Sequence, residues 1–254
     1  MALITCDFFS ESLGFGQSMT VVLPQAMQAQ VGVTSARDSD GDGPPVLYLL
    51  HGMSDDHTAW LRYTSIERYA AAAGLAVVMP AAARSFYTDE AHGHAFWRFV
   101  ADELPEIVSS FFRVSARPER TYVAGLSMGG YGAVRLALAR PQRYAGAASL
   151  SGALDIVRRA GEPERREEMH GRIFGGPPGP DHDLFALLER ARPGDVPPLH
   201  ITCGEQDRLL EDSQEFVRRA EAKGLDVTSA FPGGDHEWGL WDRVIQGVIA
   251  WLPR

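Results

Sequence analysis

Cysteine is scarce in this sequence, and neither a long apolar stretch nor a basic charge excess is present. The 254 residues include two cysteines, Cys6 and Cys203. Two cysteines cannot build a disulfide framework, and their wide separation lacks the short ligand spacing of a metal site. No apolar run approaches the roughly 20 residues of a membrane span. The N-terminus lacks the basic segment and long apolar stretch of a signal peptide. We therefore expect a cytoplasmic protein with no membrane partner.

The charge balance excludes another class of partner. The chain has 24 Lys plus Arg against 33 Asp plus Glu, a formal net charge of −9. A nucleic-acid-binding protein would show clustered basic residues and a basic domain, so we expect no nucleic-acid partner. Hydrophobic residues make up 45% of the chain and charged residues 22%, which is enough for a sizeable core. The acidic excess favours solubility and does not identify a substrate.

Short apolar runs alternate with amphipathic stretches along most of the chain. This alternation predicts an α/β fold with a mostly parallel central sheet and helices on both faces. An antiparallel pair at residues 3–10 and 18–23 leads into the sheet. The remaining strands are expected at 46–50, 75–79, 121–124, 145–150, 199–203 and 227–231, and helices at 65–73, 99–112, 128–139 and 212–223.

Residues 156–197 interrupt this pattern. They are first highly charged and then rich in glycine and proline. The segment is too long for an ordinary connection. We expect a small cap or lid insertion over the sheet, within a single domain that spans 1–254. The alternative is a surface insertion with no role.

Residues 35–45 form a second irregular, polar segment. Asp38, Asp40 and Asp42 match the start of a calcium-binding loop. The twelfth position of that pattern should be a bidentate glutamate, but here it is Leu49, inside an expected strand. We therefore interpret the segment as a solvated hairpin loop.

The strongest catalytic signal is the Gly-Leu-Ser-Met-Gly sequence at 125–129, which has Ser127 at its centre. It follows an expected strand and precedes an expected helix. Flanking glycines permit the sharp strand-to-helix turn that exposes a nucleophilic hydroxyl, and the helix N-terminus adds free N–H groups beside it. The alternative is a glycine-rich turn that packs a helix on a sheet.

A serine nucleophile needs a base, and the base needs an orienting acid. Asp207 and His236 each follow an expected parallel strand, in the order Ser, acid, His that this type of turn requires. Parallel strands bring their carboxyl ends to one edge, so the three side chains should meet there. Glu205 and Asp235 are rival acids or solvated loop carboxylates.

Backbone N–H groups should complete the site as an oxyanion hole. One belongs to Met128, directly after the serine, and the other to Met53, in the loop that follows the strand at 46–50. Gly52 would permit the turn that aims the Met53 N–H inward. His92 and His94 could pair on a metal, but the spacing fixes no third ligand, so we expect no metal.

Three segments together resemble a known family. Residues 48–53 (YLLHGM), 125–133 (GLSMGGYGA) and 234–238 (GDHEW) resemble the esterase D and tributyrin esterase-like family of α/β hydrolases. This family is related to S-formylglutathione hydrolases, feruloyl esterases and antigen 85. The likeness runs almost end to end. It implies the α/β-hydrolase fold and hydrolysis of carboxylic esters, with the serine, aspartate and histidine above as nucleophile, acid and base and the two methionine N–H groups as oxyanion donors.

The resemblance and the motifs predict a serine carboxylesterase that hydrolyses short-chain acyl esters of small molecules, of the acetyl or butyryl type. The reaction proceeds through an acyl-enzyme and needs no cofactor. Trp60 and Trp238 are candidates for lining the substrate pocket. An alternative is a thioesterase like S-formylglutathione hydrolase, or an acyltransferase. S-formylglutathione hydrolases usually carry a cysteine shortly after the first oxyanion loop, but residues 53–58 of this chain contain none. A further alternative is a non-catalytic binding module. Homo-oligomer formation is left open.

Overall fold

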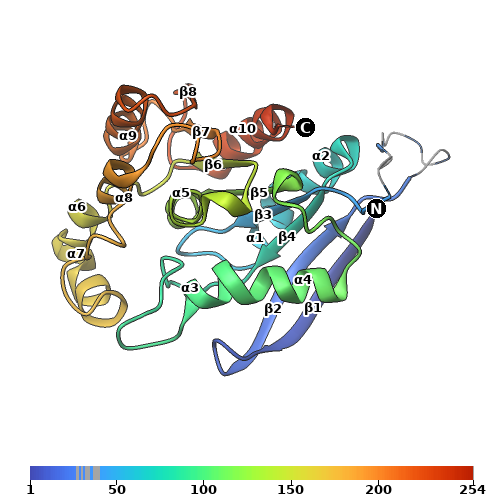
Figure 1. Ribbon diagram of the computed structural model, residues 1–254, viewed down its shortest axis with the longest axis horizontal. Coiled ribbons are helices and arrows are strands. Elements are labelled where there is room, and N and C mark those ends of the chain that lie inside the picture. The colour runs from blue at the N-terminus through green and yellow to red at the C-terminus, as the bar shows by residue number, and fades with distance from the viewer. Residues whose placement is uncertain (27–28, 30, 32–34, 37–40, 254) are drawn as a thin grey trace.

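A twisted sheet forms the centre of the molecule in the computed structural model, which describes residues 1–254 except 27–28, 30, 32–34, 37–40 and 254 (Figure 1). Within the described residues eight strands pair in the order β1-β2-β4-β3-β5-β6-β7-β8. Strands β1 and β2 pair in antiparallel fashion and β2 is antiparallel to β4, whereas the others are parallel. The strands are β1 (Ala2–Ser10), β2 (Phe15–Leu23), β3 (Val46–Leu50), β4 (Ala76–Pro80), β5 (Thr121–Leu126), β6 (Gly146–Leu150), β7 (Leu199–Thr202) and β8 (Val227–Ala230).

Helices cover both faces of the sheet, as the sequence predicts. Two separate apolar clusters pack on the two faces, one under α1, α2 and α10 and the other under α4, α5, α8 and α9. The helices are α1 (Ala59–Tyr63), α2 (Ile66–Ala73), α3 (Phe96–Arg98), α4 (Leu104–Phe111), α5 (Met128–Ala139), α6 (Ile156–Ala160), α7 (Pro163–Arg166), α8 (Leu184–Arg190), α9 (Leu210–Ala222) and α10 (Trp238–Trp251). No described helix combines the length and apolar character needed to cross a bilayer.

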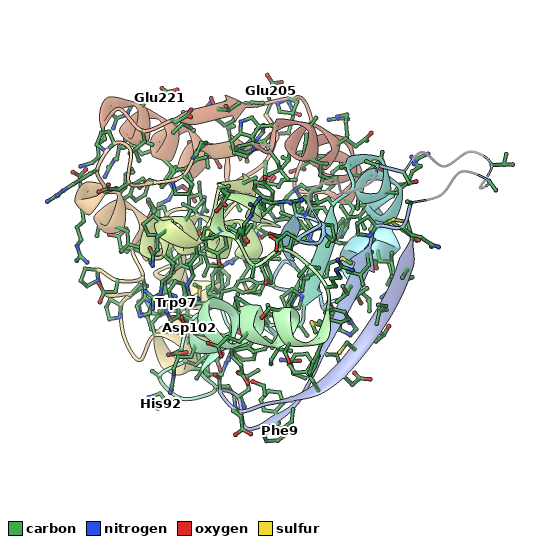
Figure 2. All side chains as sticks on the ribbon, turned by 45° about the vertical axis from the view of Figure 1, so that its right-hand side comes forward. Phe9, His92, Trp97, Asp102, Glu205 and Glu221 are labelled. Carbon is green, nitrogen blue, oxygen red and sulfur yellow. The ribbon has the colours of Figure 1, made fainter. Side chains whose placement is uncertain are left out.

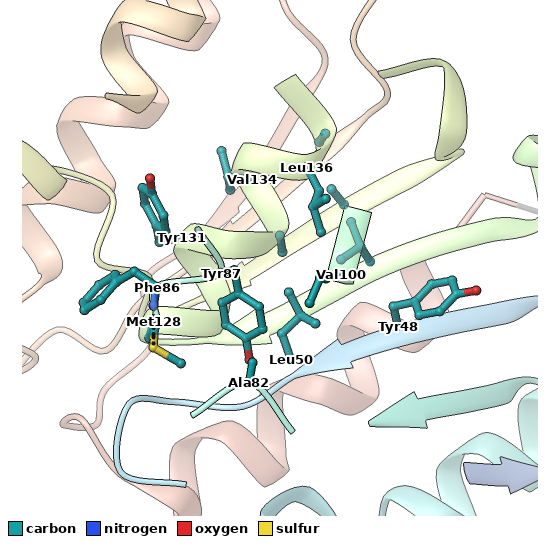
Figure 3. Packing of buried hydrophobic residues seen from close by; sticks show 14 of the residues in the cluster. Tyr48, Leu50, Ala82, Phe86, Tyr87, Val100, Met128, Tyr131, Val134 and Leu136 are labelled. Atoms are coloured by element: carbon teal, nitrogen blue, oxygen red, sulfur yellow. Dashed lines mark hydrogen bonds between the residues drawn. The ribbon is translucent and has the colours of Figure 1, made fainter. Parts of the chain in front are cut away.

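Strand β3 shows why continuous apolar runs become central strands here. Successive side chains of a strand point to opposite faces. Tyr48 and Leu50 enter the cluster under α5, whereas Leu47 and Leu49 enter the cluster under α10. Each face therefore needs apolar side chains, and the usual alternation of polar and apolar residues is lost. Figure 3 shows Leu50 packed with Tyr87 and the residues of α5.

Two helical regions differ from the sequence expectation. The helix expected at 99–112 begins earlier, because α3, a π-helical turn at Phe99–Glu103 and α4 follow one another without a break. Helix α10 was not predicted, although its buried residues Leu240, Trp241, Ile245, Val248 and Ile249 follow helical spacing.

Residues 156–197 contain α6, α7, a π-helical segment at Glu167–Ile173 and α8. Figure 1 shows α6 and α7 on the side of the molecule away from the N-terminus. The segment at 35–45 falls partly outside the described residues, because Asp38 and Asp40 are not described. In the part that is described, the Ser115 hydroxyl donates to the Asp42 carboxylate at 2.9 Å.

Candidate active site

Ser127 lies in a strained turn between β5 and α5. Its backbone has φ 53° and ψ −114°, a left-handed conformation that side chains other than glycine rarely adopt. The flanking glycines act mainly through close packing. A Cβ on Gly125 would lie 2.4 Å from the Gly129 carbonyl oxygen, and a Cβ on Gly129 would lie 2.5 Å from the Leu50 carbonyl oxygen. The turn can therefore approach the sheet only with glycine at both positions.

His236 connects the hydroxyl of Ser127 to the carboxylate of Asp207. The imidazole Nδ1 lies 2.8 Å from Oδ2 of Asp207, and Nε2 lies 3.1 Å from Oγ of Ser127. The three residues follow β5, β7 and β8, whose carboxyl ends share one edge of the sheet. With Nδ1–H donating to the carboxylate, Nε2 is free to accept the serine proton.

Asp207 is buried, with 4% of its surface exposed, and is held by several donors. Its Oδ1 accepts a hydrogen bond from the Leu209 N–H at 2.9 Å, while Oδ2 faces His236. Burial by itself raises the pKa of Asp207, but the hydrogen bond and charge of His236, with the bonds from Leu209 and Ser151, lower the pKa below its usual value. The carboxyl group is therefore ionised at neutral pH.

Trp241 orients the imidazole from the side. Its ring meets the His236 ring edge to face, with centroids 4.9 Å apart and an interplanar angle of 88°. The indole N–H donates to the Ser151 hydroxyl at 3.1 Å. Since Ser151 also hydrogen bonds the Asp207 carboxyl group, one serine links the indole to the acid.

Of the two residues expected to supply the oxyanion hole, Met53 lines the cavity beside Ser127, and Met128 directly follows Ser127 in the chain. Met128 is the first residue of α5, where a helix N–H has no acceptor in a preceding turn. Gly52 and Met53 line the cavity next to Ser127. Gly52 packs closely, since a Cβ there would lie 2.6 Å from Leu126 Cδ1 and 3.0 Å from Asp55 Oδ2, and its φ is not in the left-handed region. The chain does turn after Gly52, since the Asp55 N–H donates to the Gly52 carbonyl oxygen at 3.2 Å.

His51 fixes the loop that carries Met53. The imidazole is buried, with 1% exposed, and its Nε2 accepts the Ala82 N–H at 2.9 Å. Its Nδ1 therefore carries the proton and donates to the Gly52 carbonyl oxygen at 2.6 Å. Burial lowers the pKa of His51 to about 4, so the ring is neutral at physiological pH.

The Met128 side chain supports the wall on the other side. Its sulfur accepts a hydrogen bond from the Phe86 N–H at 3.3 Å, and both side chains are buried (Figure 3). Phe86 has φ 50°, a second strained residue beside the site. Phe86 also lines the cavity, so the loop after β4 helps to shape it.

The rival residues lie elsewhere or make other contacts. Glu205 is exposed, and Figure 2 shows it at the surface. Asp235 accepts the backbone N–H of His236 at 2.7 Å, so it contacts the loop backbone. His92 and His94 are exposed, and His94 packs edge to face against Phe15. Among the described residues, no three His, Cys, Asp or Glu side chains are grouped to hold a metal ion.

A cavity of about 290 Å³ opens beside Ser127. Trp238 and Trp241 both line it. The prediction for Trp60 is wrong: its side chain is 1% exposed, donates from Nε1 to the Leu50 carbonyl oxygen at 3.1 Å, and packs edge to face behind Trp238 at 5.3 Å. Trp60 therefore supports the wall from within the core.

Five charged residues of the cavity wall were missed by sequence reasoning, one of which, Glu237, lies directly after His236. Arg159 and Arg165 come from α6 and α7, Arg208 comes from the loop after β7, and Asp55 comes from the loop after β3. The arginines belong to charged stretches in which nothing distinguishes a wall residue from a solvated one. Asp55 lies two residues after Met53, so its place near the site could have been inferred from the sequence.

Comparison with known proteins gives consistent matches over the whole chain. Residues 20–251 match the model of the Esterase family. An acetyl esterase of Caldicellulosiruptor saccharolyticus is 29% identical over 266 residues, covering 100% of this chain and 99% of the relative. Two solved Staphylococcus aureus structures are similar. FphF, a fluorophosphonate-binding serine hydrolase, has a TM-score of 0.87 and 31% identity, covering 100% of this chain and 98% of the other. The S-formylglutathione hydrolase FrmB has a TM-score of 0.84 and 30% identity, covering 100% and 99%.

Proposed function

Because this chain belongs to the Esterase family and is a serine ester hydrolase with the α/β-hydrolase fold, we propose that it cleaves short-chain acyl esters with Ser127 as nucleophile, His236 as base and Asp207 as acid. The observation that carries this proposal is the chain of hydrogen bonds from Asp207 through His236 to Ser127. Ser127 and His236 both line the cavity. Each pair lies within hydrogen-bond distance, so His236 can take the serine proton while Asp207 orients the imidazole.

The proposed reaction has two acyl-transfer steps. Ser127 attacks the ester carbonyl carbon while His236 takes its proton, and the N–H groups of Met53 and Met128 stabilise the negative oxygen that forms. Collapse of this intermediate breaks the bond to the alcohol, which receives the proton from His236. Water then attacks the acyl-enzyme with His236 again as base, and the acid is released. Asp207 stabilises the imidazolium in both steps.

The size of the cavity supports a small acyl group. Its volume of about 290 Å³ lies at the lower end of the range for small-molecule sites, roughly 300–1,000 Å³. Phe86, Trp238 and Trp241 contribute an apolar surface suited to an acetyl or butyryl chain. We also propose that residues 156–197 act as a cap, because α6 and α7 contribute two residues to the wall.

A thioesterase activity is the second candidate. It is favoured by the similarity to the S-formylglutathione hydrolase, which is 30% identical over the full chain. The missing cysteine in residues 53–58 argues against it. The same nucleophile and base would serve either substrate. The two activities are therefore distinguished by comparing the rates for an alcohol and for a thiol leaving group.

The test is hydrolysis of p-nitrophenyl acetate, butyrate and octanoate, with S-formylglutathione beside them. We expect kcat/KM to be highest for the short esters. Ser127→Ala should lower it by at least about a thousandfold, because removal of a triad serine leaves only the oxyanion hole and binding. Ser109→Ala is the matched control, since Ser109 is an exposed serine of α4 and contacts the Glu106 carbonyl oxygen.

Two further variants test the roles of the acid and the base. His236→Ala and Asp207→Asn should each lower kcat by about ten-thousandfold while the protein stays folded. An inactive wild type on all of these esters would refute the esterase proposal. Wild-type rates in any of the three variants would refute the assigned role of that residue. A clear preference for S-formylglutathione would replace the ester assignment with the thioesterase.

A further inference from the structure

Three arginines line one part of the cavity. Arg159, Arg165 and Arg208 come from α6, α7 and the loop after β7, and we call them the basic wall. They converge from separate elements in a chain whose net charge is −9. Cationic side chains gathered at a cavity repel one another, and that repulsion is relieved by carboxylates of the protein or by a bound anion.

Arg159 is held by three partners within the protein. Its guanidinium donates to Asp212 at 2.7 Å, to Glu162 at 2.7 Å and to the Arg208 carbonyl oxygen at 2.9 Å. Its side chain is 9% exposed. Arg159 therefore holds the wall in place and has few donors left for a ligand.

The other two arginines have spare donors. Arg165 reaches Glu162 at 3.3 Å, and it shares this carboxylate with Arg159. Arg208 is exposed, and its side chain forms no ion pair within the described part of the chain. Burial lowers the pKa of Arg165, and the charge of Arg208 nearby lowers it further. The three arginines of the basic wall thus carry more positive charge than the carboxylates paired with them can neutralise.

The acidic residues of the cavity do not neutralise the basic wall. Asp55 and Glu237 line the same cavity. The Asp55 carboxyl group accepts a hydrogen bond from the Gly52 N–H and interacts with Asp56 and His236. Over the residues that the structure describes, neither carboxylate forms an ion pair with an arginine of the wall.

We propose that the basic wall binds a carboxylate of the substrate through Arg165 and Arg208, so that the natural ester carries this anion on its acyl or its alcohol part. This inference rests on the esterase function proposed above. The guanidinium group presents paired N–H donors that match a carboxylate, and such charge-assisted bonds are stronger than neutral ones. An apolar wall at Trp238 and a basic wall then select an ester that is short and anionic.

Paired substrates test this specificity. The acyl pair is 4-nitrophenyl hydrogen adipate and its methyl ester, and the alcohol pair is 4-acetoxybenzoate and its methyl ester. In one of the two pairs we expect kcat/KM for the free acid to exceed that for the methyl ester by about tenfold or more. The preferred pair identifies the part of the substrate that faces the wall. Added salt should reduce the preference, because salt screens charges that are partly exposed.

The variant Arg165→Met/Arg208→Met should lower kcat/KM for the preferred acid about tenfold more than for its methyl ester. Replacing both residues with lysine should restore part of the preference, because the charge is kept. Arg166→Met is the control, since Arg166 lies on α7 outside the cavity and donates to the Gly161 carbonyl oxygen. Far-UV circular dichroism confirms that each variant is folded.

The outcomes separate the two proposals. If the methyl esters are cleaved as fast as the acids in both pairs, the anionic substrate is refuted and the esterase function stands. Equal losses on acid and ester in the methionine variant refute the role of these arginines. If the wild type cleaves neither the acids nor the esters, the esterase function itself fails.

Discussion

His51 shows at the residue scale how one neutral side chain joins two loops of the site. It accepts the Ala82 N–H after β4 and donates to the Gly52 carbonyl oxygen after β3. The bond from Ala82 needs the uncharged ring, because a charged imidazole has two donors and no acceptor. The position of the Met53 N–H therefore depends on the protonation of a residue outside the triad.

This dependence predicts acid sensitivity. The pKa of His51 falls from 6.5 in the unfolded chain to about 4 in the folded protein, so the unfolded state binds more protons between these values and stability falls as the pH falls through this window. Between pH 7.5 and pH 5, urea unfolding should show the wild type losing about 2 kcal/mol more than His51→Asn. Other buried histidines contribute equally to both proteins. Equal losses in the two proteins would contradict the account.

Sequence reasoning selected the three residues of the proposed triad but not the whole cavity wall. Ser127, Asp207 and His236 could be assigned because each follows a strand, and strand order fixes where parallel strand ends meet. Trp60 is buried because it packs against Trp238 at the start of α10. A local sequence pattern cannot predict a contact between such distant residues. Arg208 is one charged residue among many in the sequence, and only the folded chain places it beside Ser127.

At the element scale, helix α5 is held unusually close to the sheet. The approach depends on backbone contacts between α5 and the end of β3. Gly129 faces the carbonyl oxygens of Leu50 and His51, at 2.5 and 2.7 Å from where its Cβ would lie. Neither oxygen can move without disturbing the loop that carries Met53, so packing and catalysis depend on the same contact.

A pair of glycine substitutions within helices tests this contact. Gly129→Ala should lower the free energy of unfolding by about 2–3 kcal/mol, because the added methyl group overlaps backbone atoms. Gly247→Ala in α10 should instead raise it by up to about 1 kcal/mol, since nothing lies within 4 Å of its Cβ and alanine is the better helix former. Chemical denaturation measures both. A neutral Gly129→Ala would show that α5 can move away from β3.

The central strands β3, β4, β5 and β6 were expected to within about two residues, because strands buried on both faces leave continuous apolar runs. Strand β3 coincides with the expectation at 46–50, and helix α5 with that at 128–139. Helix α10 was missed although its apolar residues follow helical spacing. The helix begins at Trp238, only two residues after His236. The residues around His236 were assigned to a catalytic motif, and no helix was predicted after them.

At the scale of the whole molecule, a buried charge cluster ties the proposed cap to the rest of the chain. Asp212 on α9 is 3% exposed and pairs with Arg158 and Arg159 of α6. Apolar residues of the segment, among them Ile156 and Ile173, also pack into the core. Sequence patterns gave the charged segment and its length, but they could not tell which charges are buried.

Asp212→Asn should therefore loosen α6 and α7 before the sheet. Removing one partner of a buried ion pair costs about 3–5 kcal/mol. We expect amide hydrogen exchange at residues 156–173 to rise by about a hundredfold while β3 and β5 keep their protection. Glu215→Gln is the control on the same helix, because its pairs with Arg218 and Arg219 are largely exposed and should contribute little. Unchanged exchange in the cap, or a uniform rise over the whole chain, would contradict this role.

The most direct test of the central claim is the site of covalent modification by a fluorophosphonate, read by mass spectrometry of the intact protein and its peptides. An activated serine beside a base attacks phosphorus and expels fluoride, which leaves one stable adduct. The account predicts a single adduct on Ser127, and no adduct in Ser127→Ala or in His236→Ala over the same time. An adduct on another residue, or equal labelling of Ser127→Ala, would contradict it.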